Sequence, residues 1–369
     1  MRAKERFRSA ERFVRSYTEG MRESELGRLF DRDAARAYDV LTREYGGGEE
    51  PESRFWRFLH RARIFFLGIS FKLSPPRRLL FAVCIVLGLW GATDIDLDYT
   101  PSIRMAILSL ASLAGLVLLL VLELADRVLV RDELEVAREL QRELLPRLAP
   151  TVPGYEFAFS YRTANTIGGD YYDFLPLEDG RVVLVMGDAS GHGIAAGLLM
   201  AIANSALKLG FDADPDPVAV ASQVNRALCR TGGRRAFMTL FCGVLEPRTG
   251  RIGFVCAGHP FPLLLRADGG IDELGSGSLP LGIRTELDLE RHEAVLDPGA
   301  TLLMYTDGVV ESLNPEGESF GFERLRHELV RGGSARAVHD RIVSELDGFR
   351  REEPVADDVS LVVVSRLSG

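Results

Sequence analysis

The chain has 369 residues, of which 46% are hydrophobic and 26% charged, and its formal net charge is −9. It is longer than one typical domain, and its composition is that of a globular chain rather than a disordered one. The acidic balance argues against a nucleic-acid-binding protein, because binding a phosphate backbone needs a basic surface. The four cysteines show no CxxC spacing, which argues against zinc and indicates reduced thiols in a cytosolic domain.

The first 78 residues are basic, with 18 Lys and Arg against 12 Asp and Glu. Apolar residues recur at helical spacing up to about residue 45 and predict small amphipathic helices, and "GGGEEPES" then predicts a linker. From Arg54 to Arg78 the chain carries seven basic residues, no acidic residue and several aromatic ones. This composition suits an anionic lipid surface. We expect residues 1–78 to form a helical, basic region in the cytoplasm.

Two uncharged stretches follow. Met105 to Leu122 has 18 residues without a charged side chain, which as a helix would span about 27 Å, close to the thickness of a bilayer core. Leu79 to Thr93 is also uncharged but would span only about 22 Å. A basic flank, two apolar spans and an acidic loop between them predict a transmembrane hairpin over residues 79–122 at the inner (cytoplasmic) membrane, with both flanking regions and the domain that follows in the cytoplasm. A buried hairpin of a soluble domain is the alternative that the short first span leaves open.

Residues 123–150 predict a linker helix that carries signals. Its apolar residues recur at three- and four-residue intervals, with one polar interruption at Gln141. The positions of this seam are Val130, Leu134, Ala137, Leu144 and Leu148. Such a seam favours pairing with the same helix of a second copy, as a homodimer. A single amphipathic helix packed on the following domain explains so few repeats equally well.

Residues 151–369 have the texture of an α+β domain. Short β-rich runs are separated by turn signals such as "EDGR", "PRTGR" and "ADGG", which predict hairpins. Hairpins dominate over alternation of strand and helix. We therefore expect two central antiparallel sheets covered by helices.

Four aspartates stand at strand ends or glycine-bounded turns with no Lys or Arg beside them: Asp170, Asp188, Asp307 and Asp357. Carboxylates that converge on one place repel each other, and divalent cations relieve that repulsion. Ligand oxygens without His or Cys select Mg²⁺ or Mn²⁺. Two such ions can activate a water for displacement at phosphorus. The neighbouring glycines would let backbone carbonyls and a bulky phosphoprotein come close to the metals.

The order of these motifs resembles a known family. "IGGDYYDF", "GDASGHG", "AGHPFPLLL", "LLMYTDGVVES" and "DDVSLVVV" are similar to the bacterial PPM-type, metal-dependent protein serine/threonine phosphatases of the SpoIIE/RsbU branch. The resemblance covers roughly residues 135 to 367. It implies an αββα sandwich and two metal ions.

By position, the resemblance implies that Asp188 bridges both metals and that the backbone carbonyl of Ala189 is a companion ligand. It implies that Asp170, Asp307 and Asp357 supply the remaining carboxylates, so these aspartates are the expected catalytic and metal-binding residues. Asp358 stands where relatives often have a second polar residue.

Other polar residues near these motifs have simpler interpretations. Asp173 is expected to be structural, and His192 to support its loop, since it lies four residues after Asp188 instead of two. Arg162 could bind substrate phosphate, but a solvated surface arginine is the simpler interpretation. His259 is expected to pack or hydrogen-bond within a turn.

The combined prediction is a membrane-tethered phosphatase that hydrolyses phosphoserine or phosphothreonine on a protein. The resemblance implies that the substrate is a phosphorylated anti-sigma-factor antagonist of the STAS type. It also implies that helix 123–148 acts as a switch. Two alternatives stay open. A pseudophosphatase scaffold would bind phosphoproteins without turnover, and a dinuclear phosphodiesterase would hydrolyse small nucleotides.

Overall fold

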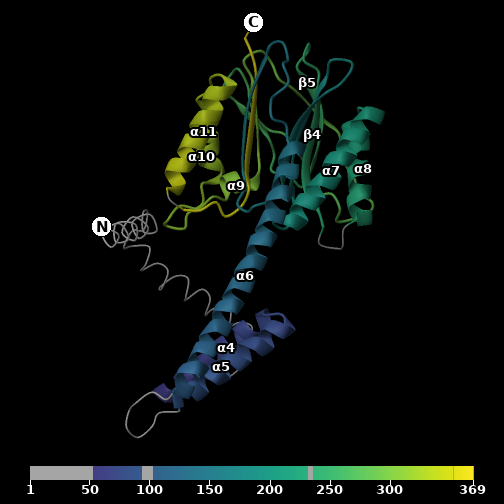
Figure 1. The fold of residues 1–369 in the computed structure, drawn as a ribbon. Helices are drawn as coiled ribbons and strands as arrows, with labels where there is room; N and C mark the ends of the chain where they lie inside the picture. The colour runs from purple at the N-terminus through teal and green to yellow at the C-terminus, as the bar shows by residue number, and fades with distance from the viewer. Residues whose placement is uncertain (1–52, 94–102, 232–235, 352, 369) are drawn as a thin grey trace, which may run out of the picture. The chain divides into compact units, whose positions relative to one another are not determined.

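The structure is a computed structural model that describes residues 53–93, 103–231, 236–351 and 353–368 (Figure 1). The chain divides between Val128 and Leu129 into two compact units. The amphipathic helices predicted before residue 45 and the acidic loop predicted after Thr93 lie outside the described residues.

The first unit contains helices α4 (Arg54–Lys72) and α5 (Pro75–Thr93) and the first part of α6 (Ile103–Leu144). The break between α4 and α5 falls before two prolines, because the residue ahead of a proline avoids the helical conformation and proline itself suits a first helical turn. The rings of Phe66 and Phe81 stack with centroids 5.5 Å apart and join the two helices.

Small residues line the contact between α5 and α6. Ser112 Oγ donates to the carbonyl of Cys84 at 2.7 Å, and both residues are buried. A Cβ at Gly115 would collide with Cys84 Sγ, so glycine there lets the helices approach closely. Arg77 before the first apolar stretch and Asp126 after the second form an ion pair at 2.5 Å. The two helices therefore run antiparallel with these ends together.

The outward faces of α5 and α6 are apolar. Their exposed large hydrophobic residues include Leu79, Val83, Val86, Leu89, Trp90, Ile107, Leu110, Leu113, Val117 and Leu120. Among the helices that the structure describes, α6 from Ala106 onward and α7 (Ile194–Ala213) are long and apolar enough to cross a membrane. The apolar window of α7 is 44% buried, as in a core helix, whereas that of α6 is 11% buried.

The second unit contains two five-stranded antiparallel sheets. The first sheet has the order β1-β10-β9-β6-β7 and the second the order β2-β3-β4-β5-β8. The strands of the first sheet are β1 (Tyr155–Arg162), β10 (Val359–Arg366), β9 (Thr301–Tyr305), β6 (Leu263–Leu265) and β7 (Ile271–Glu273). Those of the second are β2 (Asp170–Pro176), β3 (Val182–Ala189), β4 (Met238–Leu245), β5 (Arg251–Ala257) and β8 (His292–Val295).

Helices cover both sheets from outside. α7 and α8 (Pro217–Thr231) pack on the second sheet, and α10 (Gly321–Val330) and α11 (Ala335–Arg350) flank the first (Figure 1). A single turn, α9 (Asp307–Val310), follows β9. The predicted fold, two antiparallel sheets between helices, is confirmed, and the hairpins at "EDGR", "PRTGR" and "ADGG" join β2 to β3, β4 to β5 and β6 to β7.

The continuous apolar runs of β9 and β10 reflect burial on both faces. Leu302 and Val362 face the core between the sheets, whereas Leu303 and Val363 face the core beneath α10 and α11. Because successive strand residues point to opposite faces, a strand buried on both sides has no polar alternation.

Helix α6 ends at Leu144, four residues before the predicted end, because Pro146 disfavours helical conformation at the residue before it. The last turns of α6 belong to the second unit, and there the predicted seam packs on the sandwich: Gln141 is buried, and Leu144 packs against the core. Val130 and Leu148 at the two ends of the seam are exposed. The last turns therefore pack on the domain that follows, and pairing of α6 with a second copy stays a prediction.

Candidate functional site

The predicted carboxylates gather where both sheets end. Asp170, the first residue of β2, lies directly opposite Asp188 near the end of β3. Asp307 begins α9 two residues after the end of β9, and Asp357 lies two residues before the start of β10. Since β9 and β10 are neighbours in one sheet, and β2 and β3 in the other, residues far apart in sequence meet at one edge.

Asp170 joins the two sheets. It is 1% exposed, and its Oδ2 accepts hydrogen bonds from Thr306 Oγ1 at 2.8 Å and from Ser360 Oγ at 2.7 Å. Both hydroxyl groups come from the first sheet's side of the sandwich, whereas Asp170 belongs to the second sheet. These two donors stabilise the charge of a carboxylate that is otherwise removed from water.

The two adjacent aspartates before β10 differ in their surroundings. Asp357 is exposed. Asp358 is buried and binds the loop before β2, accepting from the backbone N–H groups of Ala164 at 2.8 Å and Gly169 at 2.5 Å. Asp357 therefore remains available to a ligand, and Asp358 anchors the loop.

Like charge dominates the electrostatics of the site. Burial, followed by the charges of Asp307, Asp357 and Asp358, raises the pKa of Asp188 to about 8. Burial and then the charge of Asp188 raise the pKa of Asp170 well above its ordinary value, against the opposing effect of the two hydroxyl donors. The pKa of Asp307 is raised by burial and then by Asp357. The cluster thus holds more negative charge than its surroundings neutralise.

Glycine at positions 168 and 169 lets the loop before β2 approach the carboxylate cluster closely. A Cβ at Gly169 would lie 2.7 Å from the carbonyl oxygen of Ala189 and 3.1 Å from Asp188 Oδ1. A Cβ at Gly168 would collide with the Tyr161 hydroxyl and with Asp358 Oδ2. The oxygens of Asp188 and Ala189 consequently stand side by side beside Gly169.

The donor set fits a hard divalent cation by its chemistry, because it consists of carboxylate and carbonyl oxygens whose mutual repulsion a cation would relieve. Within the described ranges, no group of three or more His, Cys, Asp or Glu side chains is already arranged to hold a metal ion. Binding would therefore draw the side chains together around the ion. Asp188, Asp170, Asp307, Asp357 and the Ala189 carbonyl are the residues available for this.

The remaining polar residues singled out from the sequence lie around this cluster. Asp173 accepts from the Tyr171 hydroxyl and pairs with Lys208 at 3.3 Å, a structural role. Arg162 forms a bidentate pair with Asp347 of α11.

The two histidines differ. His192 is exposed in the turn before α7. His259 is buried and contacts Thr239 Oγ1 at 2.9 Å, and this hydroxyl accepts from the backbone N–H of Asp188. Burial lowers the pKa of His259 to about 3, so it is neutral near neutral pH.

Sequence reasoning missed the residues that hold the carboxylates in place. Thr306 directly precedes the predicted Asp307, and Ser360 lies two residues after Asp358. This closeness in sequence is the signal that could have found them. In the sequence Gln141 is only a polar interruption of the apolar seam. Its amide makes two hydrogen bonds to Gly168, donating to the carbonyl at 2.5 Å and accepting from the N–H at 3.1 Å.

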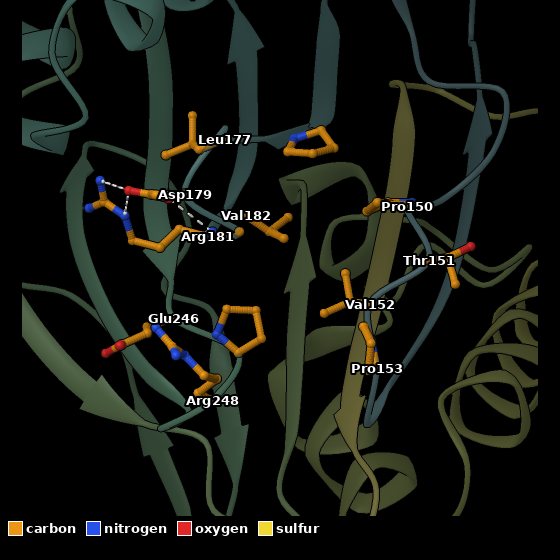
Figure 2. A pocket seen from close by; sticks show the side chains of 13 residues that line it. Pro150, Thr151, Val152, Pro153, Leu177, Asp179, Arg181, Val182, Glu246 and Arg248 are labelled. Carbon is orange, nitrogen blue, oxygen red and sulfur yellow. Dashed lines mark hydrogen bonds and ion pairs between the residues drawn. The ribbon is translucent and has the colours of Figure 1, made fainter.

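A large cavity lies at the opposite ends of β2 and β3 (Figure 2). Its volume is about 780 Å³, and it is lined by the connection 150–153 and by the β2–β3 and β4–β5 turns. None of the predicted ligands lines it. The carboxylate cluster instead opens at the surface through the exposed Asp357, as a site for a protein substrate would.

The sequence is similar to those of several known proteins. The family model described as "Stage II sporulation protein E (SpoIIE)" matches residues 178–367. Protein IcfG of Synechocystis sp. is 28% identical over 265 residues, 64% of this chain and 42% of its own length. Phosphoserine phosphatase RsbU of Bacillus subtilis is 24% identical, over 64% of this chain and 71% of its own length. The chain thus spans less than half of the first of these relatives.

Solved structures share the fold. The SiaA-PP2C domain of Pseudomonas aeruginosa matches with a TM-score of 0.58 and 22% identity, over 65% of this chain and 98% of that domain. The RsbU and RsbW domains of Rv1364c from Mycobacterium tuberculosis match with a TM-score of 0.53 and 32% identity, over 61% of this chain and 63% of that one.

The raised pKa of Asp188 makes the stability of the metal-free domain depend on pH. In the unfolded chain this group titrates near pH ~3.9, and in the folded protein at about 8. Between these values the folded state holds a proton that the unfolded state has lost, so stability falls as pH rises from about 4 to about 8. Asp188→Asn should therefore stabilise the metal-free domain by up to about 5 kcal/mol at pH 8 and by almost nothing at pH 4.

This difference is measured by urea unfolding of the EDTA-treated fragment 123–369 across that pH range. Asp179→Asn is the matched control, because Asp179 is exposed and pairs with Arg181. A stability difference for Asp188→Asn that stays constant from pH 4 to pH 8 would contradict the proposed electrostatics.

Proposed function

The chain belongs to the SpoIIE family of PPM-type phosphatases, and we propose that it is a metal-dependent protein serine/threonine phosphatase. The observation that carries this proposal is the convergence of Asp170, Asp188, Asp307 and Asp357 at one edge of the sandwich. Burial and then like charge raise the pKa values of Asp170, Asp188 and Asp307. All four predicted carboxylates are present, which argues against a scaffold without turnover.

The placement of each residue suggests its role in metal binding or in orienting a metal ligand. Asp188, with the Ala189 carbonyl beside it, would hold the cations, and Asp170, Asp307 and Asp357 would complete the set. Two bound Mg²⁺ or Mn²⁺ ions would supply Lewis-acid activation of water and neutralise phosphoryl charge. Thr306 and Ser360 keep Asp170 oriented through their hydrogen bonds. The open surface at Asp357 would admit a phosphorylated side chain that projects from a protein.

The first test is phosphate release from a phosphoserine protein with and without Mn²⁺. We expect release that depends on Mn²⁺ and falls more than about 100-fold in Asp188→Asn, because a bridging ligand is lost. Asp179→Asn should retain activity. Binding of the phosphoprotein without release by the wild type would instead favour the scaffold, and hydrolysis confined to small phosphodiesters would favour the phosphodiesterase.

The proposed substrate is a phosphorylated regulatory protein of the STAS type, that is, an anti-sigma-factor antagonist. Support comes from the relatives named phosphoserine phosphatase RsbU and RsbP and from the surface position of the site.

We further propose that α5 and α6 form a transmembrane hairpin that anchors the protein to the inner membrane. Their outward faces are apolar while Cys84, Ser112 and Gly115 lie inside the contact, the arrangement of helices packed in lipid. The ion pair between Arg77 and Asp126 brings both charged ends to the same side, as a cytoplasmic entry and exit require.

Cysteine labelling tests the hairpin. In a background with the four native cysteines replaced by serine, a cysteine at Thr100 should react with an impermeant maleimide added outside the cell, and one at Ser53 should react only after lysis. The full chain should also stay with membranes in alkaline carbonate. Release by carbonate, with equal labelling of both positions, would contradict the anchor and favour a buried soluble hairpin.

The last turns of α6 are proposed to control the site through Gln141. This buried amide binds both peptide groups of Gly168, two residues before Asp170. Movement of the helix would therefore displace the loop that leads into Asp170. Pairing of α6 with a second copy, through its exposed residues such as Val136 and Leu140, would be one way to move it.

Gln141→Ala should lower the stability of the fragment 123–369 by about 1–3 kcal/mol, because it leaves buried backbone groups unpaired. Glu139→Ala, on an exposed position of the same helix, should change it by less than about 0.5 kcal/mol. A fragment starting after Pro150 should differ in Mn²⁺-dependent activity from one starting at Glu123. Equal activity of the two fragments would remove α6 from the mechanism.

A further inference from the structure

Tyr161 has a buried hydroxyl group that the proposed chemistry leaves unexplained. The residue lies near the end of β1, opposite Ser360 of β10. Its hydroxyl oxygen is buried and has no hydrogen-bond partner among the residues that the structure describes. A buried donor without an acceptor costs about 1–3 kcal/mol. Such a group in a native fold needs a reason.

Carboxylates surround this hydroxyl. It lies beside Gly168, where a Cβ would meet both the Tyr161 hydroxyl and Asp358 Oδ2, so the two oxygens are neighbours across the glycine. Asp358 Oδ2 accepts one hydrogen bond, from the N–H of Gly169 at 2.5 Å. A carboxylate oxygen has room for a second donor.

The hydroxyl keeps its proton in this setting. Burial and then the charges of Asp358 and Asp170 raise the pKa of Tyr161. The group is therefore a donor at every pH at which the protein would work. Because the oxygen is buried, a phosphoprotein bound at the surface does not reach it, and any role must act through neighbouring residues.

Hydroxyl groups donate hydrogen bonds to the neighbouring carboxylate of Asp170. Thr306 and Ser360 donate to Asp170, and such neutral donors stabilise an ionised carboxylate without cancelling the charge that attracts a cation. Asp358 is held by two backbone N–H groups. Tyr161 lies across Gly168 from it and has a free donor.

We propose that Tyr161 is a positioning residue of the metal centre, whose hydroxyl donates to Asp358 Oδ2 when the carboxylate cluster closes around a divalent cation. This bond would fix the Gly168–Gly169 backbone against the 357–358 turn, and so hold Asp170 and Asp357 on either side of Asp188. The inference rests on the proposed function, because it assumes that the cluster binds a metal.

The test compares Tyr161→Phe with the wild type, both as the full chain in detergent micelles. Isothermal titration with Mn²⁺ should give a dissociation constant about 5- to 10-fold higher in the variant, the effect of one lost hydrogen bond. Phosphatase activity should fall by a similar factor at limiting Mn²⁺ and return to within about twofold at saturating Mn²⁺. The second readout separates metal positioning from a general loss of structure.

Tyr155→Phe is the matched control. Tyr155 lies on the same strand, at the other end, and its hydroxyl donates to the Pro247 carbonyl at 3.2 Å. This variant should bind Mn²⁺ within about twofold of the wild type. An equal loss of affinity in both variants would overturn the proposal.

Three other results would also overturn it. If the hydroxyl is only an unpaired buried group, Tyr161→Phe will be more stable than the wild type and bind Mn²⁺ equally well. A loss of kcat that saturating Mn²⁺ does not restore contradicts a positioning role. Should Tyr161→Phe not fold, Gly168→Ala provides a second test, because its Cβ would enter the space between the two oxygens, and unchanged Mn²⁺ affinity in it overturns the proposal.

The same titration separates this inference from the proposed function. If the wild type bound no Mn²⁺, the result would contradict the proposed metal centre and, with it, the proposed role of Tyr161. If the wild type bound Mn²⁺ but released no phosphate, the proposed activity would fail, and the ratio of dissociation constants would still decide the role of Tyr161.

Discussion

Negative charge concentrated at one end of two packed sheets is the constraint on which the rest of the second unit depends. Asp170 is buried between the sheets and receives hydrogen bonds from Thr306 and Ser360, which belong to the opposite side of the sandwich. Its orientation therefore requires that the sheets pack in register. In turn, burial and repulsion raise the pKa of Asp188, so the fold holds this edge in a state that a cation would stabilise.

The loop before β2 is held by two separate parts of the chain. Asp358 holds it through the N–H groups of Ala164 and Gly169, and Gln141 holds it through both peptide groups of Gly168. One contact comes from the turn before β10 and the other from α6. The loop that leads into Asp170 is thus shared between the catalytic sandwich and the helix that precedes it.

The first unit packs in the opposite way to a water-soluble domain, which buries its large apolar residues. Its small and weakly polar residues, such as Cys84 and Ser112, lie in the contact between α5 and α6, and its large apolar residues face outward. In water this arrangement would expose apolar surface at a high free-energy cost, whereas in lipid the outward face needs no cover and close packing supplies the association.

The sequence by itself determined the elements and the chemistry. Apolar runs buried on both faces, hairpin turns with glycine, and aspartates at strand ends are local patterns, and they predicted the two sheets and the oxygen ligands of the site. Tertiary structure alone decided what holds those ligands. Thr306, Ser360 and Gln141 bind residues that lie far from them in sequence, because the contact of one sheet with the other, and of α6 with the loop before β2, forms only when the chain has folded. The different burial of Asp357 and Asp358 arose in the same way, since only the packed loop shows which of two identical neighbours faces inward.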